Sequence, residues 1–103
     1  MTGMSTVARP YAKAAFEYAL GKKALEDWSD MLATLAQVAQ DGDVHERVLS
    51  NPQLTSTQKA DLLLDVCGDA VNDEVGNFLR LVGSQARLAA LPAIAEQFEL
   101  LKA

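Results

Sequence analysis

Apolar residues recur at three- and four-residue spacing along almost the entire chain, and this periodicity narrows the possible folds more than any other feature. The clearest series is Leu25, Trp28, Leu32, Leu35 and Ala39. On a helix these side chains share one face, whereas the alternation that is typical of a strand is sustained nowhere. We therefore expect an all-α protein.

Proline and glycine set the expected ends of the first helix. Pro10 has no backbone N–H and fits best in a first turn, so the helix is expected to begin between Thr6 and Arg9. Gly21 is expected to end it, because glycine readily adopts the left-handed conformation of a helix C-cap. The second helix is then expected over residues 22–40.

Capping residues predict the next two helices. Asp43, with Glu46 three residues later, forms a capping-box pattern for a short third helix that should end near residue 50, just before Pro52. Thr55 and Gln58 form a second capping box, which predicts the start of a fourth helix.

Glycine and asparagine separate the remaining helices. Gly68 closes the fourth helix, Asn72 caps the fifth, and a break near 85–87 leads into a sixth, where Pro92 fits the opening turn. The inward faces of the last two helices are expected to carry Val75, Phe78, Leu79 and Val82, and then Leu91, Ile94, Ala95, Phe98 and Leu101. Six helices with short connections predict a compact six-helix antiparallel bundle, a single domain over residues 1–103.

The residue types needed for catalysis or metal binding are scarce. The chain has one histidine and one cysteine, which excludes sites built from several such ligands. His45 lies among polar neighbours, and Cys67 falls on an apolar helix face, where cysteine behaves as a small hydrophobe. The acidic residues are accounted for by caps, helix dipoles and solvated surface. We expect no catalytic residues, no metal and no cofactor, and therefore a protein that is not an enzyme.

Charge and hydropathy restrict the partners. The formal net charge is −5, so the basic surface that nucleic acids or anionic lipids require is absent. No run of apolar residues is long enough to cross a membrane, and the N-terminus lacks the pattern of a signal peptide. We expect a chain that binds no nucleic acid, does not insert into a membrane and is a monomer in isolation.

The first helix has more apolar surface than one core stripe requires. Its charges, Arg9, Lys13 and Glu17, lie in one row, and the apolar arc beside them covers about 200°. One flank is assigned to the core because small side chains allow a neighbouring helix to approach closely: Ala8, Ala12, Ala15 and Ala19. The second flank contains two tyrosines, which are common at protein interfaces, and consists of Val7, Tyr11, Ala14 and Tyr18.

The fifth helix has a similar surplus, since Leu81 lies off its inward stripe on the side of Asn77. Two helices with spare apolar edges can form a groove for a third helix. Packing of both flanks inside the bundle is the competing interpretation, and the pattern alone leaves both open.

Several stretches, in the same order along the chain, resemble one protein family. The segment TVARPYAKAAF, residues 6–16, resembles the N-terminal signature of the δ subunit of bacterial F-type ATP synthase, whose mitochondrial counterpart is the oligomycin-sensitivity-conferring protein. Further matches are Trp28, DML at 30–32, VCG at 66–68 and RL.ALP...EQF at 87–98. The resemblance implies a six-helix N-terminal domain, in agreement with the helix count above.

The resemblance also implies a function. In the family, this domain sits on the catalytic head and binds the N-terminal helix of an α subunit between its first and fifth helices, which helps to hold the head still while proton flow turns the rotor. It implies a peripheral location at the cytoplasmic face of the bacterial inner membrane. The groove residues implied by position are Tyr11, Asn77 and Leu81. Those added from the helical wheel alone are Val7, Ala14, Tyr18 and Phe78.

Two departures from the family pattern matter. Family members are nearly twice as long, with a C-terminal domain that engages the b subunit of the peripheral stalk, so we do not expect this chain to bind that subunit. The family often has Asn-Gly where this chain has Gln85-Ala86. The end of the fifth helix is therefore expected to differ locally, with Gly83 the nearest residue suited to a C-cap.

Two other functions stay open at this point. A helical adaptor could bind an unrelated amphipathic helix through the same groove, and a small hydrolase is a third, less well supported hypothesis. Binding of an α-subunit peptide distinguishes the first two, and an assay of ATP hydrolysis addresses the third.

Overall fold

Helices provide all the regular structure in residues 3–103, the part of the chain that the computed structural model describes. They are α1 (Gly3–Gly21), α2 (Leu25–Gln40), α3 (Gly42–Val44), α4 (Ser56–Cys67), α5 (Asp73–Ser84) and α6 (Leu91–Lys102). A π-helical turn at His45–Leu49 extends α3, and short 3₁₀ segments lie at Gly68–Ala70 and Leu88–Ala90. The prediction of an all-α six-helix bundle is confirmed.

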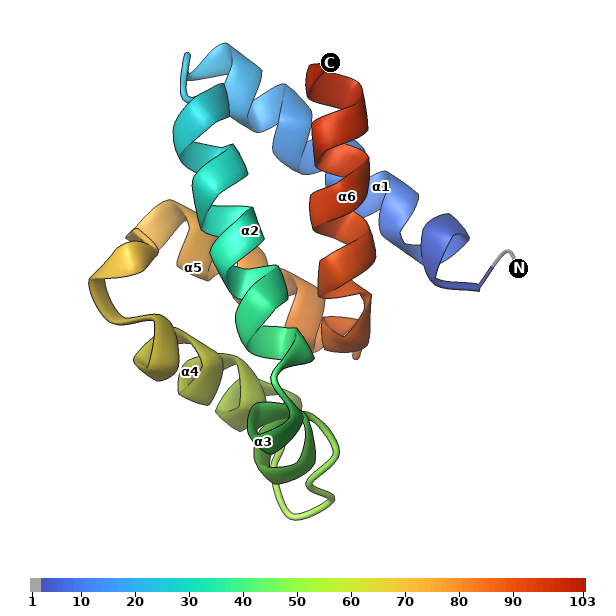
Figure 1. The fold of residues 1–103 in the computed structure, drawn as a ribbon, viewed down its shortest axis with the longest axis vertical. Coiled ribbons are helices and arrows are strands. Elements are labelled where there is room, and N and C mark those ends of the chain that lie inside the picture. Colours follow the sequence, from blue (N-terminus) through green and yellow to red (C-terminus); the bar gives the residue numbers. More distant parts are fainter. Residues whose placement is uncertain (1–2) are drawn as a thin grey trace.

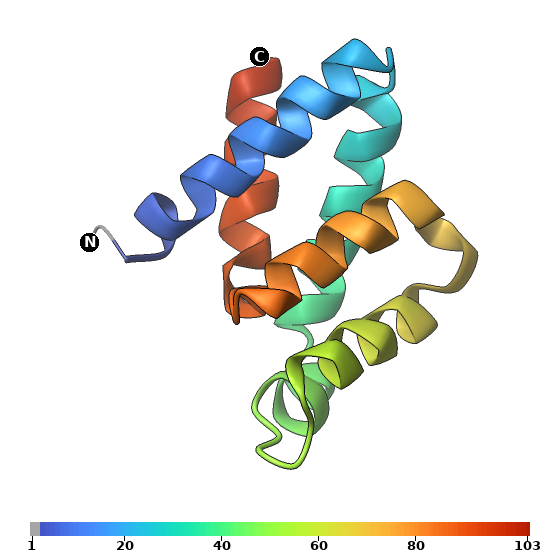
Figure 2. The ribbon, with the colours of Figure 1, turned by 180° about the vertical axis from the view of Figure 1, so that it is seen from behind.

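The helices are arranged so that α1 and α5 share one face of the molecule. α2 and α6 run antiparallel beside each other, and α4 and α5 form a second antiparallel pair (Figure 1). α1 crosses α6 obliquely and packs against it. Seen from behind, α1 and α5 lie in front of α2 and α6 (Figure 2). This face holds the candidate site described below.

The alanine flank of α1 lies in the core, as predicted. Ala8, Ala12, Ala15 and Ala19 are all buried, and α1 makes its largest contact with α6. Close approach of the two helices also brings Phe16 against Phe98, with ring centroids 6.0 Å apart in an edge-to-face arrangement. Four methyl groups in a row therefore set the spacing between α1 and the rest of the bundle.

The core stripes of the other helices are mostly as expected from the sequence. The buried residues include Trp28, Leu32, Leu35, Ala39, Val75, Phe78, Leu79, Val82, Leu91, Ile94 and Phe98. Leu101 was wrongly assigned to the inward face, since 45% of its surface is exposed. The last turn of α6 turns Lys102 toward α2 instead, where its Nζ lies 3.0 Å from Glu26 Oε2.

Local capping predictions hold best in the middle of the chain. Thr55 and Gln58 form the reciprocal capping box at the start of α4. Gly68, with φ of 57°, ends that helix, and the Asn72 side chain accepts a hydrogen bond from the Val75 N–H at the start of α5. Pro92 lies in the first turn of α6.

The start of α1 and the cap of α3 differ from the prediction. α1 begins at Gly3, so Pro10 lies inside the helix rather than in its first turn. The early turn is held by a tertiary contact, because Gln97 Nε2 donates to the Ser5 carbonyl at 2.7 Å. α3 is capped by Asp41 and not by Asp43, whose own N–H donates to the Asp41 side chain at 3.0 Å.

Two helix ends use residues other than glycine in the left-handed conformation. α1 ends in a Schellman motif with Lys23 at φ 57°, rather than with Gly21 as the C-cap, so α2 begins only at Leu25. α5 ends the same way, with Ala86 at φ 59° and not with Gly83. Gly83 is instead buried within the helix, and a Cβ there would lie 3.4 Å from the Ser56 carbonyl oxygen, at the near limit of ordinary van der Waals contact.

Replacing Ala86 with glycine is expected to stabilise the protein. The left-handed conformation costs a residue with a Cβ roughly 1–2 kcal/mol, part of which is offset by the greater freedom of glycine in the unfolded chain. We expect a net gain of about 0.5–1 kcal/mol in the free energy of unfolding, measured by urea denaturation. Ala89→Gly, three residues away and without positive φ, is the control and should destabilise; a loss of stability in both variants would contradict the assignment.

Candidate functional site

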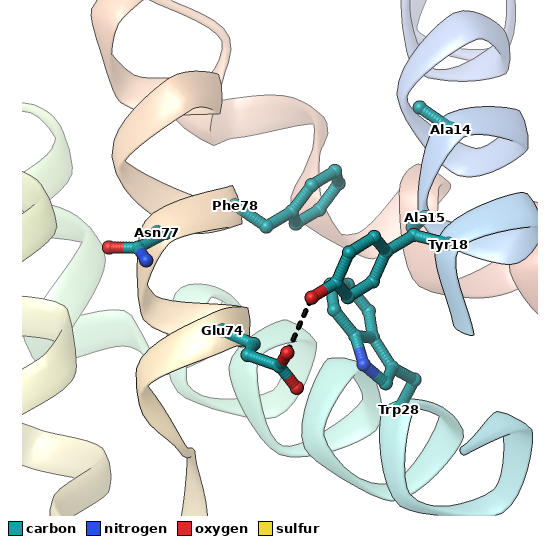
Figure 3. Close-up of a pocket in the computed structure, with 7 residues that line it drawn as sticks. All are labelled: Ala14, Ala15, Tyr18, Trp28, Glu74, Asn77 and Phe78. Atoms are coloured by element: carbon teal, nitrogen blue, oxygen red, sulfur yellow. Dashed lines mark hydrogen bonds between the residues drawn. The ribbon is translucent and has the colours of Figure 1, made fainter. Parts of the chain in front are cut away.

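A pocket of about 390 Å³ opens between α1 and α5. Its lining residues come from three helices and are Ala14, Ala15, Tyr18, Trp28, Glu74, Asn77 and Phe78 (Figure 3). α1 and α5 supply the two walls, and Trp28 of α2 lies between them. The surplus apolar edges of the two helices thus face a common concave surface.

Four of the seven sequence-predicted groove residues line this pocket. Ala14, Tyr18, Asn77 and Phe78 are brought together by the fold. The other three predicted residues lie outside the pocket. Val7 and Tyr11 are in earlier turns of α1 and are half-buried against the core. Leu81 lies one turn of α5 beyond Asn77. Leu81 is 51% exposed, so it extends the apolar surface of α5 rather than the pocket itself.

Three residues that line the pocket were not among the predicted groove residues: Ala15, Trp28 and Glu74. Ala15 was assigned to the core flank of α1. Glu74 lies three and four residues before Asn77 and Phe78, so its position on the same helix face was a usable signal. Trp28 is 3% exposed and belongs to the core, as its stripe indicated, yet it also forms part of the pocket wall. No local pattern reveals this second role, because α2 meets the pocket only through the tertiary fold.

Three aromatic rings from different helices support the pocket. The Tyr18 and Trp28 ring centroids are 5.4 Å apart, and those of Trp28 and Phe78 are 5.7 Å apart in an edge-to-face arrangement. These distances fall in the range favoured for aromatic pairs. The indole therefore connects the wall formed by α1 to the wall formed by α5.

Polar groups are few in this pocket. The Tyr18 hydroxyl donates a hydrogen bond to Glu74 Oε2 across the pocket (Figure 3). This hydrogen bond to the carboxylate, together with desolvation, raises the pKa of Tyr18 above its ordinary value. Glu74 is the one charged residue among those lining the pocket, while Lys22 Nζ lies on the Tyr18 ring, 5.7 Å from its centroid.

The groups that could carry other chemistry lie elsewhere. His45 is exposed, with Nδ1 3.3 Å from Ser50 Oγ. Cys67 is half-buried beside the core, and burial raises the pKa of its thiol, which favours the neutral form. Within residues 3–103, no cluster of histidine, cysteine and acidic residues has the arrangement of a metal site. Apart from Tyr18, Glu74 and Asn77, the α1–α5 pocket is lined by apolar side chains.

A second depression, of about 790 Å³, lies between α1 and α6. Exposed leucines contribute to it, but its walls also carry four charged side chains, Arg9, Lys13, Glu17 and Glu96. Three of them form the row of charges along α1 that the sequence shows. In the described part of the chain, no helix is both long and apolar enough to span a membrane.

Comparison with known proteins gives a consistent result. The family model for the ATP synthase delta (OSCP) subunit matches residues 7–103. ATP synthase subunit delta of Chromohalobacter salexigens is 61% identical over all 103 residues, and that of Hahella chejuensis is 48% identical over the same span. The corresponding subunit of Teredinibacter turnerae is 46% identical over 95% of the chain.

The chain spans only part of these relatives. It covers 57% of the first two proteins and 54% of the third. The match nevertheless includes every residue that lines the pocket, from Ala14 in α1 to Phe78 in α5. The chain belongs to the ATP synthase delta (OSCP) subunit family.

Proposed function

We propose that this chain is a stator domain of an F-type ATP synthase, and that its α1–α5 pocket binds the N-terminal helix of an α subunit. The observation that carries the proposal is the apolar pocket between two helices of a chain of this family. An amphipathic helix that docks in such a groove buries its apolar face between the walls. Tyr18, exposed by 42% at the pocket, is the kind of aromatic residue that dominates binding at interfaces.

The proposed role is mechanical and needs no catalytic group. A domain that holds the catalytic head against rotation needs an attachment that dissociates slowly, and buried aromatic anchors favour slow dissociation. We place the chain at the cytoplasmic face of the bacterial inner membrane as a peripheral part of the complex. Contact with the b subunit of the peripheral stalk would require sequence beyond this chain.

A peptide titration tests the proposal. The probe is a synthetic peptide with the N-terminal sequence of the α subunit of Chromohalobacter salexigens, whose delta subunit is 61% identical to this chain. Because Trp28 lines the pocket and is the one tryptophan in the sequence, its fluorescence should change in a saturable way on binding.

A scrambled peptide of the same composition is the control, and it should leave the Trp28 fluorescence unchanged. Equal binding of both peptides would favour the alternative of a helical adaptor without preference for the α subunit. Absence of binding to the parent peptide would contradict the proposed function.

A further inference from the structure

Glu74 is the one charged residue among those lining the α1–α5 pocket, and its side chain is exposed to solvent. Its Oε2 accepts the hydrogen bond from the Tyr18 hydroxyl, which holds the carboxylate of α5 beside the wall formed by α1 (Figure 3). Among the described residues, no ion pair links Glu74 to a basic side chain, and Lys22, whose Nζ lies on the Tyr18 ring, forms none with it. The carboxylate therefore lines the pocket without a countercharge.

A helix that docks between α1 and α5 takes water away from this carboxylate. The Tyr18 hydroxyl satisfies one acceptor position, but a carboxylate accepts several hydrogen bonds. Ala14, Ala15 and Phe78, which form most of the remaining walls, carry no side-chain donor. Because a charge that loses its water without gaining a partner weakens a complex, the docked helix has to supply that partner.

We propose that Glu74 selects a basic side chain, lysine or arginine, on the helix that docks in the pocket. The inference rests on the proposed function and names the chemistry of its partner. A hydrogen bond between two ionised groups is stronger than one to a neutral hydroxyl or amide, and a cation also compensates the negative charge. Asp73 and Asp27, exposed residues that directly precede Glu74 and Trp28, add to the negative potential, so an acidic side chain is disfavoured there.

Replacing Glu74 with glutamine tests the proposal from the side of the protein. Glutamine keeps the size of the side chain and an acceptor for the Tyr18 hydroxyl but removes the charge. The variant is expected to bind the α-subunit peptide of Chromohalobacter salexigens about tenfold more weakly, measured by calorimetry. Asp73→Asn is the matched control, since it removes the same charge from the preceding residue, which does not line the pocket. This control and Lys22→Gln should each change the affinity by about twofold or less.

Replacements in the peptide identify the residue that contacts Glu74. Each lysine and arginine is replaced in turn by glutamine, and one replacement is expected to weaken binding about tenfold. Combined with Glu74→Gln, that replacement should cause no further loss, because the shared interaction is already gone, whereas the other basic replacements should combine additively. The scan against the unaltered protein does not depend on the folding of any variant.

The possible failures are distinguishable. A parent peptide that does not bind would overturn the proposed function and this inference together. If the parent peptide binds, equal effects of Glu74→Gln and Asp73→Asn would overturn the inference alone, as would an α segment without lysine or arginine. A loss in Glu74→Gln that couples to no basic replacement would mean that a neutral donor contacts Glu74, which contradicts the selection of a cation. A tenfold loss in Lys22→Gln would place the countercharge on the protein itself and would also overturn the inference.

Discussion

Replacing Phe98 with alanine is expected to lower the free energy of unfolding by about 3–5 kcal/mol. Phe98 has no exposed surface, lies at the contact of α6 with α1 and packs edge-to-face on Phe16. Its removal leaves a cavity that rigid neighbouring helices fill only in part, so the loss exceeds the transfer free energy of the ring. Urea denaturation followed by the helical circular dichroism signal measures the change.

Leu100→Ala is the matched control for Phe98→Ala. Leu100 lies two residues further along the same helix and is 71% exposed. Its replacement should change the free energy of unfolding by about 0.5 kcal/mol or less. If Phe98→Ala were as mild as Leu100→Ala, the contact of α6 with α1 would have to be looser than the structure has it.

Replacing Tyr18 with alanine is expected to have the largest effect on peptide binding. The side chain is exposed, lines the α1–α5 pocket and presents a ring to the docked helix. Truncation of an aromatic anchor typically costs about 2 kcal/mol, which corresponds to roughly a thirtyfold loss of affinity. Calorimetry is the suitable measurement, because Tyr18 lies beside Trp28 and its removal alters the fluorescence.

Leu20→Ala is the control for Tyr18→Ala. Leu20 is also exposed on α1, but it faces the depression between α1 and α6. Its replacement should leave peptide affinity unchanged. If Leu20→Ala weakened binding and Tyr18→Ala did not, the peptide would bind in the depression between α1 and α6, which would contradict the proposed site between α1 and α5. Tyr11→Ala and Leu81→Ala then measure how far the contact extends beyond the pocket.

Features fixed by neighbouring residues could be predicted from the sequence. The capping box of Thr55 and Gln58, and the Asn72 cap, depend on side chains that reach backbone groups three residues away. The alanine stripe of α1 was predictable for a similar reason, since helical periodicity alone places its members on one face.

Features fixed by distant residues could not be predicted. The position of Pro10 predicted a later start of α1. The Gln97 side chain, 92 positions away, donates a hydrogen bond to the Ser5 carbonyl and so stabilises the earlier start. Lys23 and Ala86 adopt the left-handed conformation although glycine is preferred there. The packing of the helices that follow them fixes the direction of the chain, and this tertiary constraint outweighs the local preference. Trp28 joins the pocket only because α2 passes behind α1 and α5, as Figure 2 shows.

The alanine stripe has a consequence for how sequences of this kind diverge. Ala15 is buried in the stripe and also lines the pocket. The distance between α1 and α6 and the width of the pocket therefore both depend on where α1 lies. A valine or leucine at Ala8 or Ala19, neither of which lines the pocket, would lift α1 and change that width without altering a single contact residue. Substitutions in the stripe are therefore expected to be accepted during evolution mainly together with compensating changes in the partner helix.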